Sequence, residues 1–392
     1  MGSLVGVLLH ECRERLALLD DVGRQHPSGL RTEVARIVRR PRRDQESVAG
    51  MQDHGGTSLD LHLDIASDDV ADLFAGVNVP SGLDADRNLR FHLHDLAADV
   101  RTLLERGGLE YLLDAGATAL AAPPGPHVDD VRLLAPLRPA SIRDSVSFEA
   151  HIEGARKSQE GAQDSVPARW YEAPCFYFTN PHVCHGPFED VHRFPDSELF
   201  DLECEVGVVY GEYASNLTPE EARKGIVGYT IFNDWSARDI QKIEGQLPFG
   251  FFKGKDGAHT LGPYLVTADE LEPYRTEDGF LDLTMRAYIN GELLGEDSLA
   301  NMAWTFEELI AFASRGSAVA PGDVLGSGTC QRGCLTEIWG RAGTRTPPPL
   351  VPGDVVTLEV EGIGTVRNRI VEAVKVPDIP RGRKGQPRGA RH

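Results

Sequence analysis

Two acidic residues, Glu203 and Glu205, stand two positions apart in an otherwise apolar stretch of the chain. The apolar residues of 201–210 recur at the period of two that is typical of a β-strand, so both glutamates fall on the opposite face. At that spacing they are roughly 6.5–7 Å apart along the strand, and burying both charges unpaired would be costly. A hard divalent cation between them would remove this cost. A solvated edge strand is the alternative that needs no ligand.

A second group of reactive side chains leaves the end of another predicted strand, residues 228–232. The run that follows, 233–241, reads Asn-Asp-Trp-Ser-Ala-Arg-Asp-Ile-Gln and contains a carboxylate, a cation and an amide in Asp234, Arg238 and Gln241. Groups of these three types can bind a small polar ligand together. Arg238 also has a structural interpretation, since its charge could neutralise the carboxylates nearby.

Asp144 and His151 precede this region, on a predicted strand-to-helix junction. Phe148, His151 and Ala155 share one face of the predicted helix, and Asp144 lies near its start, where an acidic side chain often caps the backbone. On the local sequence alone, both residues have ordinary structural interpretations. Residues 156–195 are rich in Pro, Gly and His, which favours a long loop that closes over a site.

The composition is typical of an enzyme of the reducing cytoplasm. The chain has 392 residues and a formal net charge of −20, which opposes binding to nucleic acid and to anionic membrane surfaces. No stretch approaches the roughly 18 apolar residues that a transmembrane helix needs. The six cysteines form no Cys-x-x-Cys pair, so neither a zinc motif nor a disulfide framework is indicated. We therefore expect a cytoplasmic location.

Strands are expected to dominate the second half of the chain. Residues 281–289 alternate as a strand, Asn290-Gly291 forms a hairpin turn, and residues 306–314 form an amphipathic helix. Upstream, residues 89–105 and 109–120 have helical periodicity and are separated by two glycines. Few helices lie between the later strands, which favours a mixed or antiparallel β architecture over a doubly wound α/β fold.

Several motifs together resemble the fumarylacetoacetate hydrolase family, across roughly residues 139–376. The run at 233–241 is the most specific of them. The segments that carry the resemblance are Asp201–Val206, Gly228–Gln241, Leu261–Tyr264, Gly328–Thr329 and Val360–Thr365. The resemblance implies an α+β, mainly β fold, a mixed β-sandwich roll with a small N-terminal domain. We expect a poorly ordered extension over 1–67, a small domain over 68–132, the catalytic domain over 133–378, and a disordered basic tail over 379–392.

The resemblance also implies the roles of individual residues. It implies a cofactor of Mg²⁺ or Ca²⁺, with Mn²⁺ as a further candidate, and a homodimer that acts on a small oxo-acid substrate. The implied metal ligands are Asp144, Glu203, Glu205 and Asp234. The implied catalytic residues are His151 as general base, Glu337 as the carboxylate that orients it, and Lys253, which we favour over Lys255 as the active-site lysine. The implied substrate contacts are Gln241, Thr329 and Arg238.

From these roles we expect a metal-dependent hydrolase that cleaves a C–C bond of a 2,4-dioxo acid, in aromatic or specialised catabolism. A hard cation would hold the dioxo acid, and His151 would take a proton from water. A metal-dependent lyase or isomerase acting on a related 2-oxo acid is the alternative. Val146, Glu160 and Gly245 stand where the fumarylacetoacetases proper carry tyrosine, arginine and tyrosine, so a substrate other than fumarylacetoacetate is expected.

Overall fold

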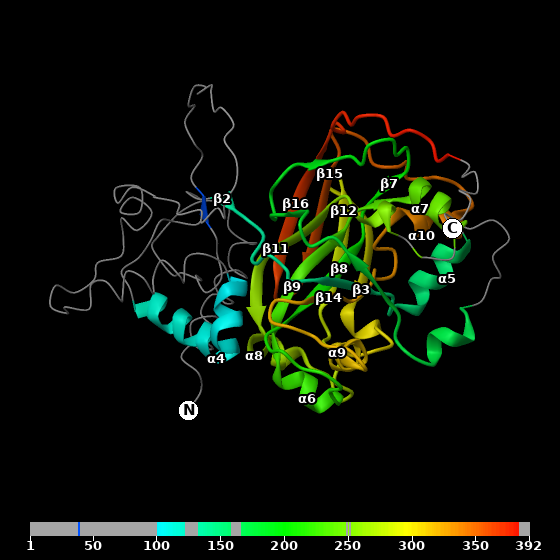
Figure 1. The fold of residues 1–392 in the computed structure, drawn as a ribbon. Helices are drawn as coiled ribbons and strands as arrows, with labels where there is room; N and C mark the ends of the chain where they lie inside the picture. Colours follow the sequence, from blue (N-terminus) through cyan, green and yellow to red (C-terminus); the bar gives the residue numbers. More distant parts are fainter. Residues whose placement is uncertain are drawn as a thin grey trace, which may run out of the picture.

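The computed structural model describes residues 38–39, 100–121, 132–157, 166–247, 250 and 252–383. Strands and helices contribute similar numbers of residues to this part of the chain, and the strands form its central sheets (Figure 1). The α-helices are α4 (Val100–Ala121), α5 (Glu149–Lys157), α6 (Pro219–Lys224), α7 (Arg238–Glu244), α8 (Ala268–Leu271), α9 (Phe306–Ser314) and α10 (Leu335–Ala342). The 3₁₀ helices are η2 (Ala168–Tyr171), η3 (Lys253–Lys255), η4 (Glu272–Tyr274) and η5 (Leu299–Asn301).

Two sheets make up the body of the molecule. One has seven strands in the order β4-β3-β14-β8-β9-β11-β5, and the other has five in the order β13-β12-β15-β16-β6. The strands are β1 (Val38–Arg39), β2 (Arg132–Leu133), β3 (Ile142–Ser145), β4 (Phe176–Thr179), β5 (Cys184–His185), β6 (Val191–His192), β7 (Phe200–Asp201), β8 (Cys204–Tyr210), β9 (Ile226–Asp234), β10 (Ser236–Ala237), β11 (His259–Thr267), β12 (Thr284–Ile289), β13 (Glu292–Ser298), β14 (Val324–Gly326), β15 (Val355–Val360) and β16 (Gly364–Val371).

Both sheets combine antiparallel and parallel pairs. In the larger sheet β14 pairs parallel with β3 and β11 pairs parallel with β5, while the central pairs are antiparallel. In the smaller sheet β6 runs parallel to β16. The predicted mixed or antiparallel architecture, mainly β with several helices, is therefore confirmed.

The seven-stranded sheet is buried on both faces. On one face, Val206 of β8 and Ile231 of β9 belong to the core that also includes Leu358 of the five-stranded sheet. On the other face, Val209 and Phe232 pack with a second cluster that includes residues of α4. The alternation predicted for 201–210 is confirmed, because Cys204, Val206 and Val208 all join the first core.

Local sequence signals place several of these elements. Thr305 caps α9, which has the predicted bounds 306–314: its hydroxyl accepts a hydrogen bond from the Glu308 backbone N–H, and the Glu308 carboxylate accepts one from the Thr305 backbone N–H. Asn290 and Gly291 both adopt positive φ, as the two-residue hairpin turn between β12 and β13 requires. The two glycines before 109 interrupt α4 with non-helical backbone angles, as predicted.

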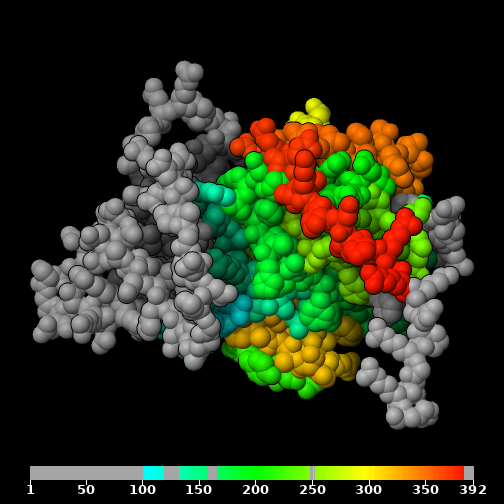
Figure 2. Space-filling model, turned by 45° about the horizontal axis from the view of Figure 1, so that its top comes forward, coloured from blue at the N-terminus to red at the C-terminus, as the bar shows by residue number. Residues whose placement is uncertain are grey.

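One expectation about chain organisation is wrong, and another falls almost entirely outside the described residues. Residues 156–195 are not one long loop, because β4, β5 and β6 lie within them. The expected extension over 1–67 lies outside the described residues except for β1, which pairs with β2. Residues 372–383 have no regular structure and run over the surface in Figure 2.

Within the described residues, no helix combines the length and apolar character that crossing a membrane requires.

Candidate active site

The predicted metal carboxylates lie on neighbouring strands of the larger sheet. Asp144 is on β3, Glu205 on β8 and Asp234 at the end of β9, and Glu203 precedes β8 by one residue. Strand β14 runs between β3 and β8, and Gly326 pairs there with Asp144. A Cβ atom at Gly326 would lie 2.2 Å from Asp144 Oδ1 and 2.9 Å from Glu205 Oε2. The missing side chain of this glycine therefore leaves room for the two carboxylates to meet.

The carboxylates form a buried cluster. Each of Asp144, Glu203 and Asp234 places a carboxylate oxygen within 4.8 Å of those of the other two. Glu205 lies beside this group, where Oε2 accepts from the Gly328 backbone at 3.1 Å and Oε1 from Thr329 Oγ1 at 3.2 Å. All four residues are at most 4% exposed. The structure thus brings the four predicted ligands into one place.

The charges within the cluster are not equivalent. Burial, followed by the charge of Asp234, raises the pKa of Asp144 to about 7. Burial and the neighbouring Asp144 also raise the pKa of Glu205 well above its usual value. Although burial opposes it, Lys255 and Arg238 lower the pKa of Glu203. The surroundings therefore favour the protonated forms of Asp144 and Glu205 and the ionised form of Glu203.

The donor set fits a hard divalent cation. All four side chains offer oxygen, which Mg²⁺ and Ca²⁺ prefer. With metal–oxygen bonds of about 2.0–2.6 Å, ligand oxygens on one ion can be up to about 5 Å apart, which accommodates the observed group. The buried Oδ1 of Asp144 lacks an ordinary donor among the described residues, because the hydrogen bond between the Asp144 and Glu205 carboxyl groups requires a proton on one of them. A cation would satisfy this oxygen and replace the proton held by Asp144 and Glu205.

The lysine of the cluster is Lys255 rather than Lys253, which corrects the assignment favoured from the sequence. Lys255 Nζ donates to Asp234 Oδ2 at 2.9 Å and also to Glu203 Oε2, and its side chain is 4% exposed. The side chain of Lys253 is 61% exposed and pairs with Asp256 at 2.6 Å. The two lysines are the ends of η3, so one turns into the cluster while the other faces solvent.

The predicted base and its orienting carboxylate meet between two helices. His151 on α5 places Nδ1 3.5 Å from Oε2 of Glu337 on α10. Glu337 is held by Arg341, whose Nε donates to Oε1 at 2.9 Å, and by the Arg332 backbone, which donates to Oε2 at 2.7 Å. His151 also contributes to the lowered pKa of Glu203, so the pair lies within electrostatic reach of the carboxylate cluster.

The predicted substrate contacts have different surroundings. Arg238 donates to Asp201 Oδ2 and Glu203 Oε1, each at 2.7 Å, so it neutralises the carboxylates nearby. The hydroxyl of Thr329 donates its hydrogen bond to Glu205. Gln241 accepts from Arg238 at 3.2 Å, but none of the described residues partners its buried Nε2. Gln241 is thus the one of these three side chains with an unused buried donor.

Two members of the cluster were not predicted from the sequence. Tyr177 on β4 donates its hydroxyl proton to Asp234 Oδ2, and the same hydroxyl oxygen lies 2.5 Å from Asp144 Oδ2, from which it can accept a proton. His259 at the start of β11 lies opposite Asp234 in the sheet, with Nδ1 2.9 Å from Asp234 Oδ1. The aromatic run 176–178 between prolines is a strand signal, but it does not indicate that Tyr177 contacts the carboxylates.

Three residues depart from the pattern of the fumarylacetoacetases. Val146 follows β3 and its carbonyl accepts from Trp170 Nε1 at 2.6 Å. Gly245 is exposed and ends α7. Glu160 lies outside the described residues. Neither position 146 nor position 245 therefore offers the tyrosine side chain that the fumarylacetoacetases carry there.

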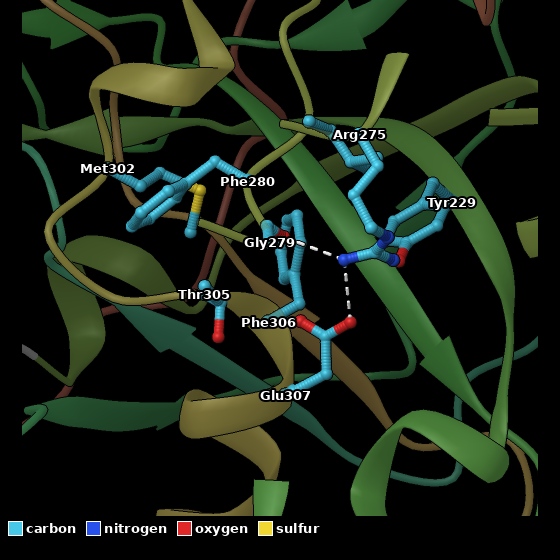
Figure 3. A pocket seen from close by; sticks show the side chains of 9 residues that line it. Tyr229, Arg275, Gly279, Phe280, Met302, Thr305, Phe306 and Glu307 are labelled. Atoms are coloured by element: carbon cyan, nitrogen blue, oxygen red, sulfur yellow. Dashed lines mark hydrogen bonds and ion pairs between the residues drawn. The ribbon is translucent and has the colours of Figure 1, made fainter. Parts of the chain in front are cut away.

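Two hollows differ in size and position. One has a volume of about 360 Å³, and its lining contains no carboxylate of the cluster; the lining residues are Phe178, Thr179, Asn180, Phe252, Lys253 and Asp256. Thr179 of its wall donates to the Lys255 carbonyl at 2.8 Å, which joins it to the cluster. The other hollow, of about 10 Å³, lies around Arg275 and Glu307 (Figure 3) and has room for about one water molecule. The first of the two has the volume for an organic acid.

Comparison with known protein families gives one match over this region. The family model for the fumarylacetoacetate (FAA) hydrolase C-terminal domain matches residues 141–371, more than half of the chain. This range contains every predicted site residue. Solved structures agree: a putative HpcE protein from Mycobacterium smegmatis has a TM-score of 0.56 at 27% identity, over 70% of this chain and 88% of that one. Fumarylacetoacetate hydrolase from Exiguobacterium antarcticum has a TM-score of 0.51 at 29% identity, over 65% and 83%.

Curated relatives carry out several reactions. The oxaloacetate tautomerase YisK of Bacillus subtilis is 32% identical over 216 residues, which cover 54% of this chain and 64% of YisK. The 4-hydroxyphenylacetate degradation bifunctional isomerase/decarboxylase of Salmonella dublin is 31% identical over 199 residues, which cover 50% of this chain and 41% of that enzyme. The chain spans about half the length of the curated relatives it matches.

Proposed function

The chain belongs to the fumarylacetoacetate hydrolase family, and from this premise we propose that it is a divalent-cation-dependent hydrolase that cleaves a C–C bond of a 2,4-dioxo acid. The observation that carries the proposal is the His151–Glu337 pair beside a buried four-carboxylate cluster. A hydrolase needs both groups of residues. The carboxylate cluster would hold the dioxo acid through a cation, and the His151–Glu337 pair would activate water. Asp144, Glu203, Glu205 and Asp234 would hold Mg²⁺, Ca²⁺ or Mn²⁺.

The cation, when bound, would polarise the 2-oxo and enol oxygens of the substrate. Glu337 faces His151 Nδ1, so Nε2 is the nitrogen that would accept a proton from water. The hydroxide adds to the distal ketone, the C–C bond breaks, and its electron pair enters the enolate of the departing oxo acid. The imidazolium then returns the proton to the enolate carbon. Gln241 Nε2 is a donor for the developing oxyanion.

The second candidate is tautomerisation or decarboxylation of a 2-oxo acid such as oxaloacetate. The named activities of YisK and of the bifunctional isomerase/decarboxylase favour it. These reactions also pass through an enol or enolate but require no attack by water. The same carboxylate cluster would serve them, so the two candidates differ in what His151 does.

Purified protein with Mg²⁺ is assayed against a panel of 2,4-dioxo acids and oxaloacetate, with products identified by NMR. Hydrolysis yields two acids, decarboxylation yields CO₂, and tautomerisation changes only the enol absorbance. His151→Ala is expected to lower hydrolysis by about 10²–10⁴-fold. His182→Ala, at an exposed histidine, is the control. Turnover of oxaloacetate with no hydrolysis of any dioxo acid would replace the first candidate by the second.

Oligomeric state and location remain predictions. A homodimer in the cytoplasm is expected from the resemblance and the composition. Sedimentation velocity of the full chain measures the oligomeric state.

The hollow beside Lys253 is proposed to take the distal group of the substrate, because Phe178 and Phe252 line it and its volume is about 360 Å³.

A further inference from the structure

The His151–Glu337 pair has a third close neighbour, the thiol of Cys334. Cys334 Sγ lies 3.7 Å from His151 Nδ1, the same nitrogen that faces Glu337 Oε2 at 3.5 Å. One ligand atom from each of the three residues lies within 4.8 Å of the other two. His151 is 7% exposed, while Cys334 and Glu337 are fully buried. The three side chains therefore form a compact nitrogen, sulfur and oxygen group.

This donor set differs in kind from the carboxylate cluster. Imidazole and thiolate favour zinc and similar transition metals, whereas carboxylates alone suit Mg²⁺ and Ca²⁺. Zinc bonds of about 2.0–2.3 Å at tetrahedral angles separate neighbouring ligand atoms by about 3.3–3.6 Å. The observed 3.7 Å and 3.5 Å are within a few tenths of an ångström of that range. Little movement would be needed to bind a tetrahedral ion.

The fold directs these three side chains toward each other. A Cβ at Gly154 would lie 2.3 Å from Glu337 Cγ, so this glycine of α5 lets α10 approach closely. Asp201 accepts from the backbone of Leu335 at 2.8 Å, at the start of α10. Cys334 is the N-cap residue of that helix, yet its side chain makes no capping hydrogen bond. Its Sγ can therefore face His151 instead.

We propose that His151, Cys334 and Glu337 form a second metal site, for Zn²⁺ or an ion of similar softness, and that its occupation inhibits the enzyme. Binding displaces the thiol proton of Cys334 to solvent and leaves one coordination position for water. No oxidant or reductant is involved. The bound ion holds His151 Nδ1, so the imidazole no longer cycles between its neutral and protonated forms. The ion site stands on geometry alone, while the inhibition rests on the proposed function.

The ion site is tested by binding of Co²⁺, used as the spectroscopic probe, to the full chain in saturating Mg²⁺. A near-ultraviolet sulfur-to-cobalt charge-transfer band at one ion per chain is expected, and Zn²⁺ should abolish it. Cys334→Ala and Cys334→Ser should lack the band. Cys330→Ala, at another buried thiol, and Cys175→Ala, at an exposed one, are the matched controls and should keep it. A wild-type protein without the band, or a band that survives both Cys334 changes, would overturn the site whatever substrate is found.

Inhibition is tested separately, with a substrate identified from the panel. At saturating Mg²⁺, Zn²⁺ should inhibit the wild-type protein, and the concentration for half-inhibition should rise at least tenfold in Cys334→Ala, measured relative to that variant's own basal rate. Equal sensitivity of both proteins would mean that Zn²⁺ acts at the carboxylate cluster, which would refute the inhibitory role. Circular dichroism confirms that each variant is folded before comparison.

Discussion

Lys253 and Lys255 show how much two residues of separation can change a side chain's role. Lys255 pairs with two buried carboxylates, and burial by itself would lower its pKa, yet the charges of Asp234 and Glu203 raise it. Lys253 pairs with Asp256 at the surface. A flexible lysine is a point charge that its neighbours can fix in place, so the neighbours and not the residue type decide its role.

Lys255→Met is expected to lower kcat by about 10²-fold or more, because it removes a fixed positive charge from the carboxylate cluster. Lys253→Met should change kcat by no more than a factor of about five, as for an exposed ion pair. Steady-state kinetics on both variants, with melting temperatures as the folding control, measure the difference. The reverse order of effects would restore Lys253 as the active-site lysine.

Glu203→Gln is expected to abolish measurable binding of divalent cations and turnover while preserving the fold. The amide cannot balance the charge of a cation, and the substitution also breaks the ion pair with Arg238. Titration calorimetry with Mg²⁺ gives the affinity. Glu212→Gln, at an exposed position, serves as the control. Wild-type Mg²⁺ affinity in Glu203→Gln would argue against the cation site.

The local pattern singled out only some acidic residues of the cluster, and the family resemblance supplied their roles and added Asp144. Glu203 and Glu205 break an apolar alternation, and Asp234 ends another strand. Tyr177 and His259 could not be placed this way. Their contacts with Asp234 depend on how β4 and β11 are arranged in the sheet, which a local pattern does not specify. The choice between Lys253 and Lys255 failed for the same reason, since loop length alone cannot orient a side chain.

Strand β14 determines the spacing of the site at the level of elements. It is short, yet it separates β3 from β8 and presents Gly326 beneath Asp144 and Glu205. Any side chain there would lie where the two carboxylate oxygens are. Nothing in the local sequence around Gly326 connects this glycine with the acidic residues, because β3 and β8 are distant along the chain.

Gly326→Ala is expected to weaken cation binding at least tenfold, because the new methyl group would lie 2.2 Å from Asp144 Oδ1 and push the carboxylates apart. The rest of the sheet should form. Titration calorimetry with Mg²⁺ and circular dichroism test both statements. Gly382→Ala, where a Cβ meets no atom within 4 Å, is the control. Unchanged affinity in Gly326→Ala would show that the cation does not need Asp144 and Glu205 together.

At the scale of the whole molecule, the cluster links cation binding to pH. The pKa of Asp144 rises from 3.8 to about 7 on folding, so between these values this one carboxyl group binds more proton in the folded protein than in the unfolded chain. The contribution of this group to stability is therefore full below about pH 4 and is lost as pH rises toward 7. A bound cation takes the place of that proton, so the stability that would be lost as pH rises is retained.

The rise in melting temperature on adding Mg²⁺, measured against EDTA, is therefore expected to grow as pH increases from about 5 to 8. Differential scanning fluorimetry at matched ionic strength provides the measurement, and the difference between the two conditions cancels the titration of groups outside the cluster. The Glu203→Gln variant should show no Mg²⁺-dependent rise at any pH. A Mg²⁺ effect that is constant across this range would contradict proton displacement from Asp144 and Glu205.

The carboxylates on β3, β8 and β9 come from positions far apart in the chain, and their strands are brought together only within the larger sheet. A cation that needs all of them can bind only after the long-range pairing is complete. It should therefore slow amide hydrogen exchange that requires global opening, at the buried centre of β8 and β9. Exchange by local fraying, as in the short helix α6, should be indifferent to the ion.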